Sequence, residues 1–203
     1  MKKILFLFLA ACFFFSCEKE TIVIPQQHAG RTVLAFFWAD NSLNSSLRNN
    51  IQTMMQGLQA MKDSAALLVY WDGEASDISW PEPCIVEYVT NGQGGINSMS
   101  KEAVNAMIAD QDMSVHDLIS IGNIRKKYPP QTSTEKTVMQ TVIGDMMSAY
   151  PSESYGIIFG SHGSGWLPTI TGTRSIGQDG GRYSSDTALI PELAEVLRTV
   201  NPQ

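Results

Sequence analysis

Short, uninterrupted apolar segments alternate along this chain with longer segments whose apolar residues recur every three or four positions. Residues 31–38 and 65–71 are two such apolar runs, and residues 43–61 between them have helical spacing. A strand that is apolar on both faces is typical of a parallel sheet covered by helices on both sides. The alternation therefore predicts an α/β fold, a sandwich with a mostly parallel sheet flanked by helices.

The same pattern continues to the end of the 203 residues. Further strands are expected at residues 84–89 and 155–159, and further helices at residues 100–128, 133–149 and 189–200. The Gly- and Ser-rich residues from about 162 to 186 are expected to form one long loop. At 43% hydrophobic and 17% charged residues the chain can bury a core, so disorder is excluded.

The first 17 residues have the pattern of a bacterial lipoprotein signal peptide. Lys2 and Lys3 precede an apolar run, Ile4 to Phe15, that is too short to cross a bilayer. Ser16 and Cys17 then resemble a lipobox, in which the cysteine becomes the lipidated first residue. An ordinary secretory signal with an incidental cysteine is the alternative. The lipobox interpretation predicts a membrane-anchored protein of the bacterial cell envelope, periplasmic or surface-exposed.

Three parts follow from these patterns: the signal peptide at 1–17, a polar tether at 18–30 and a domain at 31–203. The net charge is −6, and the one basic cluster, residues 125–127, is too small for a nucleic-acid surface. Removal of the signal and lipidation of Cys17 leave Cys84 as the only free thiol, so no disulfide framework is expected.

The most informative segment carries a histidine directly after the apolar run at 155–159. His162 is followed by Gly163, and glycines allow a tight turn that leaves the imidazole accessible. An accessible imidazole can exchange protons near neutral pH. On spacing alone, a histidine held by loop hydrogen bonds without a catalytic role remains an equal alternative.

The block from His162 to Trp166, His-Gly-Ser-Gly-Trp, resembles the clostripain family of cysteine peptidases, which belongs to the caspase-like clan. Weaker similarity occurs at three other places, so that the resemblance runs from about residue 31 to the end. These places are residues 40–43, 174–179 and 189–197. The resemblance implies a caspase-like sandwich, an endopeptidase that cleaves proteins or peptides after Arg or Lys, and an acid–base role for His162. By analogy with the clan, Gly163 would donate its backbone N–H to the oxyanion.

The family's nucleophile lies in an Asp-Ala-Cys type of motif on the strand after the next helix, and no such motif occurs before Gln203. We therefore expect this chain to be the N-terminal part of the peptidase, truncated and inactive without a C-terminal segment that carries the nucleophile. Cys84 lies far upstream of His162 and is interpreted as a small buried hydrophobe. An inactive lipid-anchored binding protein or a pseudogene fragment is the alternative.

Two further possibilities are weaker. A serine hydrolase could use Ser161 or Ser164, but the Gly-x-Ser-x-Gly elbow upstream of the histidine is missing. Some relatives need calcium, and Asp179 and Asp186 lie in a loop that could contribute ligands. Two acids are too few for a calcium site of six to eight oxygens, so no cofactor or metal is expected.

Overall fold

The computed structural model describes residues 29–61, 65–73, 82–110, 113–163, 175–179 and 186–200. The predicted signal peptide with Cys17 lies outside the described residues, as does the tether up to residue 28. The first strand already begins at Ala29, two residues before the expected start of the domain.

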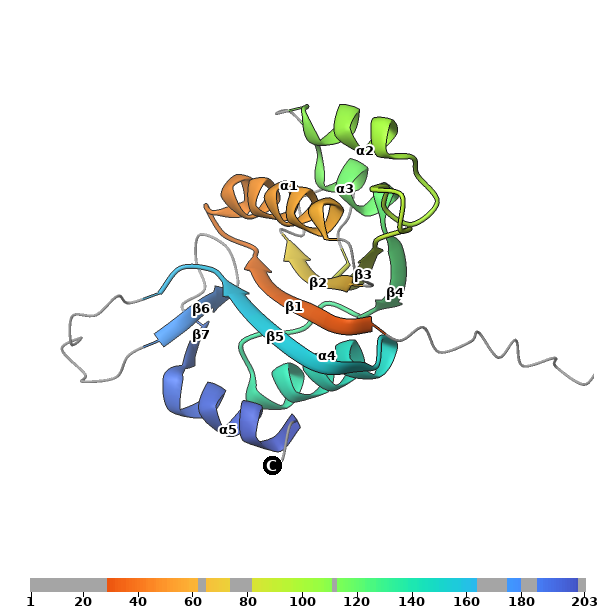
Figure 1. The fold of residues 1–203 in the computed structure, drawn as a ribbon. Coiled ribbons are helices and arrows are strands. Elements are labelled where there is room, and N and C mark those ends of the chain that lie inside the picture. The colour runs from red at the N-terminus through yellow and green to blue at the C-terminus, as the bar shows by residue number, and fades with distance from the viewer. Residues whose placement is uncertain are drawn as a thin grey trace, which may run out of the picture.

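A five-stranded mixed sheet forms the centre of the molecule, in the order β4-β3-β2-β1-β5 (Figure 1). Its strands are β1 (Ala29–Ala39), β2 (Ala65–Gly73), β3 (Cys84–Val89), β4 (Asn123–Lys127) and β5 (Ser152–Gly160). The central strand β1 pairs in parallel with β2 and with β5. β3 and β4 add to the β2 side in antiparallel orientation.

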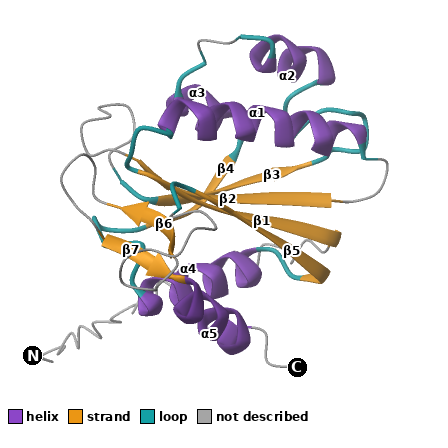
Figure 2. Cartoon of the chain, turned by 90° about the vertical axis from the view of Figure 1, so that its left-hand side faces the viewer, coloured by secondary structure: helices purple, strands orange, loops and turns teal. Residues whose placement is uncertain are grey.

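Helices cover both faces of this sheet, as the alternating pattern predicts (Figure 2). On one face lie α1 (Asn44–Ala60), α2 (Lys101–Ile108) and α3 (Val115–Ile121). On the other lie α4 (Lys136–Ala149) and α5 (Ile190–Val200). None of the helices in the described part of the chain is long and apolar enough to cross a membrane.

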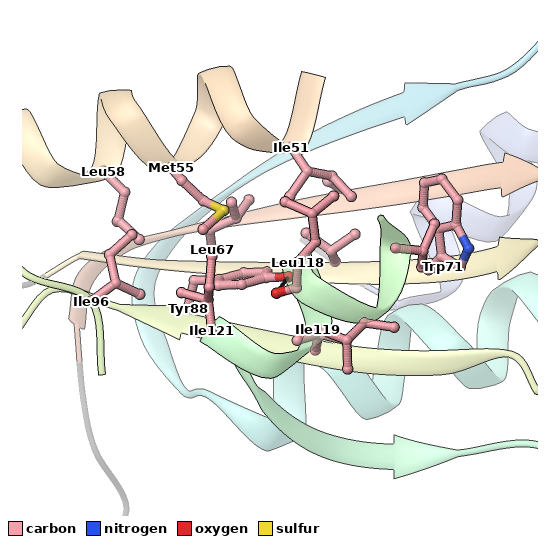
Figure 3. Close-up of a cluster of buried hydrophobic side chains, with 14 of the residues drawn as sticks. Ile51, Met55, Leu58, Leu67, Trp71, Tyr88, Ile96, Leu118, Ile119 and Ile121 are labelled. Atoms are coloured by element: carbon pink, nitrogen blue, oxygen red, sulfur yellow. Dashed lines mark hydrogen bonds between the residues drawn. The ribbon is translucent and has the colours of Figure 1, made fainter. Parts of the chain in front are cut away.

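The first hydrophobic core lies between the sheet and helices α1 to α3 (Figure 3). Met55 and Leu58 of α1 lie against Leu67 of β2, and Leu118 of α3 belongs to the same buried cluster. Tyr88 is also buried there, and its hydroxyl donates to the Leu118 carbonyl at 2.8 Å. This bond satisfies the one polar atom of an otherwise apolar side chain, so the ring can be buried without an unpaired hydroxyl.

The second core lies under α4 and α5 and is rich in aromatic rings. Phe36 and Trp38 of β1 point into it, with Tyr70 of β2 and Phe159 of β5. The Trp38 and Phe159 rings stack at a centroid distance of 5.6 Å. Since β1 contributes alternate side chains to both cores, every residue of it from Leu34 to Ala39 is buried.

The structure corrects two expectations drawn from the sequence. Residues 123–127 are not the end of a helix but the edge strand β4, in which all five residues are exposed. Residues 162–186 are not one loop, because they contain β6 (Ser175–Asp179) and the start of β7 (Asp186–Leu189), which pair antiparallel. Both errors concern short strands without apolar periodicity, which depend on a partner strand for their conformation.

Candidate active site

The site lies where the parallel strands β1 and β5 end side by side. Phe37 of β1 is the register partner of Gly160 of β5, so the residues that follow each strand leave the sheet at the same edge. In α/β sheets this carboxyl edge is where functional side chains collect. The segment Asp40 to Leu43 follows β1 here, and Ser161, His162 and Gly163 follow β5.

The side chain of Asn41 connects the ends of three strands. Its Nδ2 lies 2.7 Å from the carbonyl oxygen of Trp38, 3.2 Å from Oγ of Ser161 and 3.2 Å from the carbonyl oxygen of Gln178 in β6. Ser161 Oγ also accepts from the backbone N–H of Gln178 at 2.9 Å. With Asn41 buried, this network fixes the ends of β1, β5 and β6 relative to one another.

His162 is held at both its backbone and its ring, and it is half-buried at the sheet edge. Its carbonyl oxygen accepts a hydrogen bond from the Gly177 N–H at 2.9 Å. Its ring atom Nε2 lies 2.9 Å from Oγ of Ser42, and this pair is exposed. The His162 side chain therefore lies outside the packed interior, at the carboxyl edge of the sheet.

Gly163 forms an antiparallel bridge with Ile176 of β6. The neighbouring bond from Gly177 to the His162 carbonyl shows that Gly163 and Ile176 form a non-hydrogen-bonded pair. In such a pair the N–H and C=O groups point away from the partner strand. The Gly163 N–H is thus directed away from β6, and Gly163 as a residue is exposed.

The Trp38 ring packs against Gly177 of β6, the residue that hydrogen-bonds the His162 carbonyl. A Cβ atom added to Gly177 would lie 3.0 Å from the Trp38 ring, and the φ of Gly177 is +88°. Glycine is therefore required at this position both for space and for backbone conformation. The indole Nε1 of Trp38 donates to the Ser133 carbonyl at 2.9 Å, which orients the ring that β6 rests on.

A second polar cluster lies at the carboxyl end of β2. The Ser133 hydroxyl donates to a carboxylate oxygen of Asp72, and the Tyr70 hydroxyl lies 2.6 Å from Ser133 Oγ. Gln131 donates to the Tyr70 hydroxyl at 3.0 Å. Asp72 and Ser133 are buried, so the cluster holds the connection before α4 against the sheet and supports Trp38.

Cys84 does not belong to the site. It is the first residue of β3, is fully buried in the first core and is the register partner of Trp71. β3 is three strand spacings from β5, about 14 Å across the sheet. A thiol at that distance and depth cannot exchange a proton directly with His162, in agreement with its interpretation as a buried hydrophobe.

The remaining candidate residues from the sequence are two serines near His162 and two aspartates of the Gly- and Ser-rich segment. The Ser161 hydroxyl is bonded to the Gln178 backbone and to Asn41, so it has a structural role, and Ser164 lies outside the described residues. Asp179 and Asp186 are register partners at the ends of β6 and β7 rather than loop residues. Among the described residues, no three His, Cys, Asp or Glu side chains come together as metal ligands would.

Ser42 is the site residue that the sequence interpretation missed. In the sequence it stands out only as part of residues 40–43, one of the segments with weak similarity to the family. The signal that could have identified it is its position just after β1, if β1 and the strand before His162 are assumed to be neighbours in the sheet. Because the contact spans 120 residues, no pattern within either segment reveals it.

Known proteins resemble this chain in both sequence and structure. A secreted C11 cysteine protease from Bacteroides thetaiotaomicron, solved with an irreversible peptide inhibitor, is 26% identical with a TM-score of 0.57, covering 86% of this chain and 40% of its own. A cysteine protease from B. fragilis is 27% identical with a TM-score of 0.49, covering 70% of this chain and 95% of its own. No curated protein sequence matches.

A sequence model that represents the clostripain family matches residues 35–203, which is most of the chain and includes every site residue described above. The fold of the secreted protease agrees with this match, since it shares the helix-covered sheet over the greater part of the chain. This chain belongs to the clostripain family of cysteine peptidases.

Proposed function

We propose that this chain supplies the general acid–base histidine of a cysteine endopeptidase that cleaves proteins or peptides after Arg or Lys. The observation that carries the proposal is the position of His162. A half-buried imidazole lies directly beyond a parallel strand at the carboxyl edge of the sheet, held at its backbone by Gly177 and at its ring by Ser42. Membership of a cysteine peptidase family supports an acid–base role for this histidine.

In the proposed reaction His162 takes the proton of a thiol, and the thiolate attacks the scissile carbonyl. The acyl–enzyme forms as His162 gives that proton to the leaving amine. Water then releases the acid product with His162 again as base. The Gly163 N–H, which points away from β6, is available to the oxyanion, and one such donor is worth roughly 3 kcal/mol of transition-state stabilisation.

We propose that the thiol comes from sequence outside these 203 residues. The chain contains Cys12, Cys17 and Cys84 only, and Cys84 is buried three strands away from β5. Within the described residues β5 pairs on one side only, with β1. A strand added to its outer edge would end about 5 Å from the end of β5, close enough for a thiol to reach His162.

The length of a relative supports this arrangement. The secreted protease from B. thetaiotaomicron is matched over only 40% of its own chain, so more than half of that protein has no counterpart here. The preference for Arg or Lys rests on the resemblance to the family. An acidic residue that selects these side chains would then lie in the same outside sequence as the thiol.

The test is hydrolysis of Arg and Lys amide substrates by the complete protein, meaning this chain together with the sequence that carries the thiol. We expect His162→Ala to abolish activity, because no other described side chain can replace the imidazole at this edge. His116→Ala is the matched control and should retain full activity, since His116 is exposed at the start of α3, the helix that contacts β4 at the opposite edge of the sheet. Full activity of the His162→Ala variant would disprove the assigned role.

Absence of activity in the wild-type complete protein, with intact folding, would favour the second function, an inactive peptidase-like binding protein.

We also propose that Cys17 is lipidated and anchors the protein in the bacterial cell envelope. This proposal rests on the order of Lys2-Lys3, the apolar run and Ser16-Cys17 in the sequence.

A further inference from the structure

We propose that Ser42 is a positioning residue for His162, and that it sets which ring nitrogen carries the proton. In this arrangement Nε2–H donates to the Ser42 hydroxyl oxygen, and Nδ1 keeps a free lone pair for the thiol. The inference rests on the proposed function for its effect on catalysis. The hydrogen bond itself belongs to this chain and can be measured without any peptidase activity.

The contact is short and specific. Ser42 Oγ and His162 Nε2 are 2.9 Å apart, a distance typical of a direct hydrogen bond. In the described part of the chain, Ser42 is the only side chain that hydrogen-bonds this ring. The backbone bond from Gly177 fixes where the His162 main chain lies but leaves the side-chain torsions free. Ser42 therefore supplies the orientation that the backbone contact cannot supply.

Ser42 can do this because the turn that carries it is rigid. The Leu43 N–H donates to Oδ1 of Asn41 at 2.9 Å, and the Asn44 N–H donates to the Asn41 carbonyl at 3.1 Å. The Asn44 side chain also donates to the Ala39 carbonyl at 3.2 Å. Asn41 itself is buried and bonded to Ser161 and Gln178, on the same segments that hold His162. The hydrogen bonds of Asn41 thus position both the Ser42 hydroxyl and the segment that carries the His162 imidazole.

The chemistry requires one of the two possible directions of this bond. A hydroxyl can either donate to Nε2 or accept from it. If it donated, the neutral ring would carry its proton on Nδ1 and could not accept the thiol proton there. If it accepts, Nδ1 is unprotonated, takes the proton from sulfur and later gives it to the leaving amine, while Nε2–H stays bonded to Ser42 throughout.

Three variants separate this role from a structural one. Ser42→Ala removes the acceptor, and Ser42→Asn replaces it with an amide oxygen that can also accept from Nε2–H. Ser46→Ala, on the exposed face of the first turn of α1, removes a nearby hydroxyl that the site does not use. In the complete protein we expect Ser42→Ala to lower kcat by about 10- to 100-fold with little change in KM, because the ring is misplaced rather than the substrate. Ser42→Asn should restore most of this loss, and Ser46→Ala should have no effect.

The second readout uses the 203-residue chain with 15N-labelled histidine. At alkaline pH, where imidazole is neutral, the nitrogen shifts of His162 should show the Nε2–H form in the wild type and in Ser42→Asn, and a mixture of forms in Ser42→Ala. The His162→Ala variant identifies its signals. If these shifts change while the complete wild-type protein has no activity, the positioning role stands and the proposed function fails.

Other results would overturn the positioning role itself. An Nδ1–H form in the wild type would mean that Ser42 donates rather than accepts. Unchanged shifts and unchanged kcat in Ser42→Ala would mean that the contact orients nothing. Activity that survives thiol alkylation and is lost in Ser42→Ala would make Ser42 a nucleophile instead.

Discussion

At the scale of single residues, two glycines set how closely the strands approach the site. Gly177 supports the His162 carbonyl with a positive φ and lies against the Trp38 ring. Gly160, the last residue of β5, faces α1 where Phe37 and Leu47 leave no room for a side chain. Because neither Gly160 nor Gly177 carries a Cβ atom, the backbone next to His162 can pack closely against these side chains.

We expect Gly160→Ala to destabilise the chain by about 1–3 kcal/mol, which is the usual cost of overpacking. A Cβ atom there would lie 2.6 Å from Phe37 and 2.7 Å from Leu47. Gly156→Ala in the same strand is the control, since no atom lies within 4 Å of its added Cβ. It should be neutral or stabilising by up to about 1 kcal/mol, because alanine restricts the unfolded chain more. Urea unfolding of both variants gives the comparison, and equal stabilities would contradict the steric argument.

At this scale the sequence predicts the candidate residues but not the side chains that hold them. His162 and Gly163 are predicted because a local block of five residues is distinctive. Asn41 contacts Ser161 and Ser42 contacts His162, each across 120 residues, and their side chains have no periodic pattern. A hydrogen bond between distant polar residues depends on the register of β1 and β5, which only the folded sheet defines.

At the scale of elements, the strands with apolar faces on both sides are predicted well, and the strands at the margin are not. β2 is buried along almost its whole length and β1 from Leu34 to Ala39, so their composition alone separates them from helices. β4 is exposed at all five positions and contains three consecutive cations. Its conformation comes from pairing with β3 and not from its own residues.

The pairing of β3 with β4 includes a buried carboxylate. Glu87 of β3 is 2% exposed, and its Oε2 lies 3.5 Å from Nε of Arg125 in β4 without a hydrogen bond. Burial raises the pKa of Glu87 above its ordinary value of 4.5, while Arg125 and the amide of Asn123 act in the opposite direction. The net change in the pKa is upward, so desolvation exceeds the attraction of the neighbouring cation.

A raised pKa means that the folded state binds this proton more tightly than the unfolded state. The contribution of Glu87 to stability is therefore fully present below pH 4.5 and is lost as the pH rises through the folded pKa. We expect Glu87→Gln, which does not titrate, to gain stability relative to the wild type as the pH rises over that range, because only the wild type must ionise a buried carboxyl group. Unfolding titrations between acidic and neutral pH measure this difference. A growing advantage of the wild type with rising pH would show that the Arg125 ion pair dominates.

At the scale of the whole molecule, the sheet has two edge strands of opposite character. β4 is polar and charged, as edges that remain exposed usually are. β5 is apolar in sequence, with Tyr-Gly-Ile-Ile-Phe at its centre, yet it also pairs on one side only among the described residues. Its residue Ile158 is 41% exposed. This asymmetry fits the proposal that β5 takes a further strand, while β4 does not.

We expect Ile158→Lys to impair the complete protein and to leave the isolated chain nearly unchanged. The side chain is already exposed, so the free energy of unfolding of this chain should change by only about 0.5 kcal/mol. If the thiol-bearing segment packs on β5 as proposed, the lysine would be buried in the complete protein, and peptidase activity should fall strongly. Ile124→Lys is the matched control, because Ile124 of β4 is 40% exposed at the opposite edge. Equal losses in both variants would argue against docking at β5.

The bond between Ser42 and His162 also has a consequence for how the protein is made. Its two partners are 120 residues apart, and β5 must be synthesised and added to β1 before they can meet. A nascent polypeptide that has not yet produced β5 therefore lacks this hydrogen bond. The bond can form only after most of the central sheet has been synthesised, so the order of synthesis makes the orientation of the His162 ring a late event in folding.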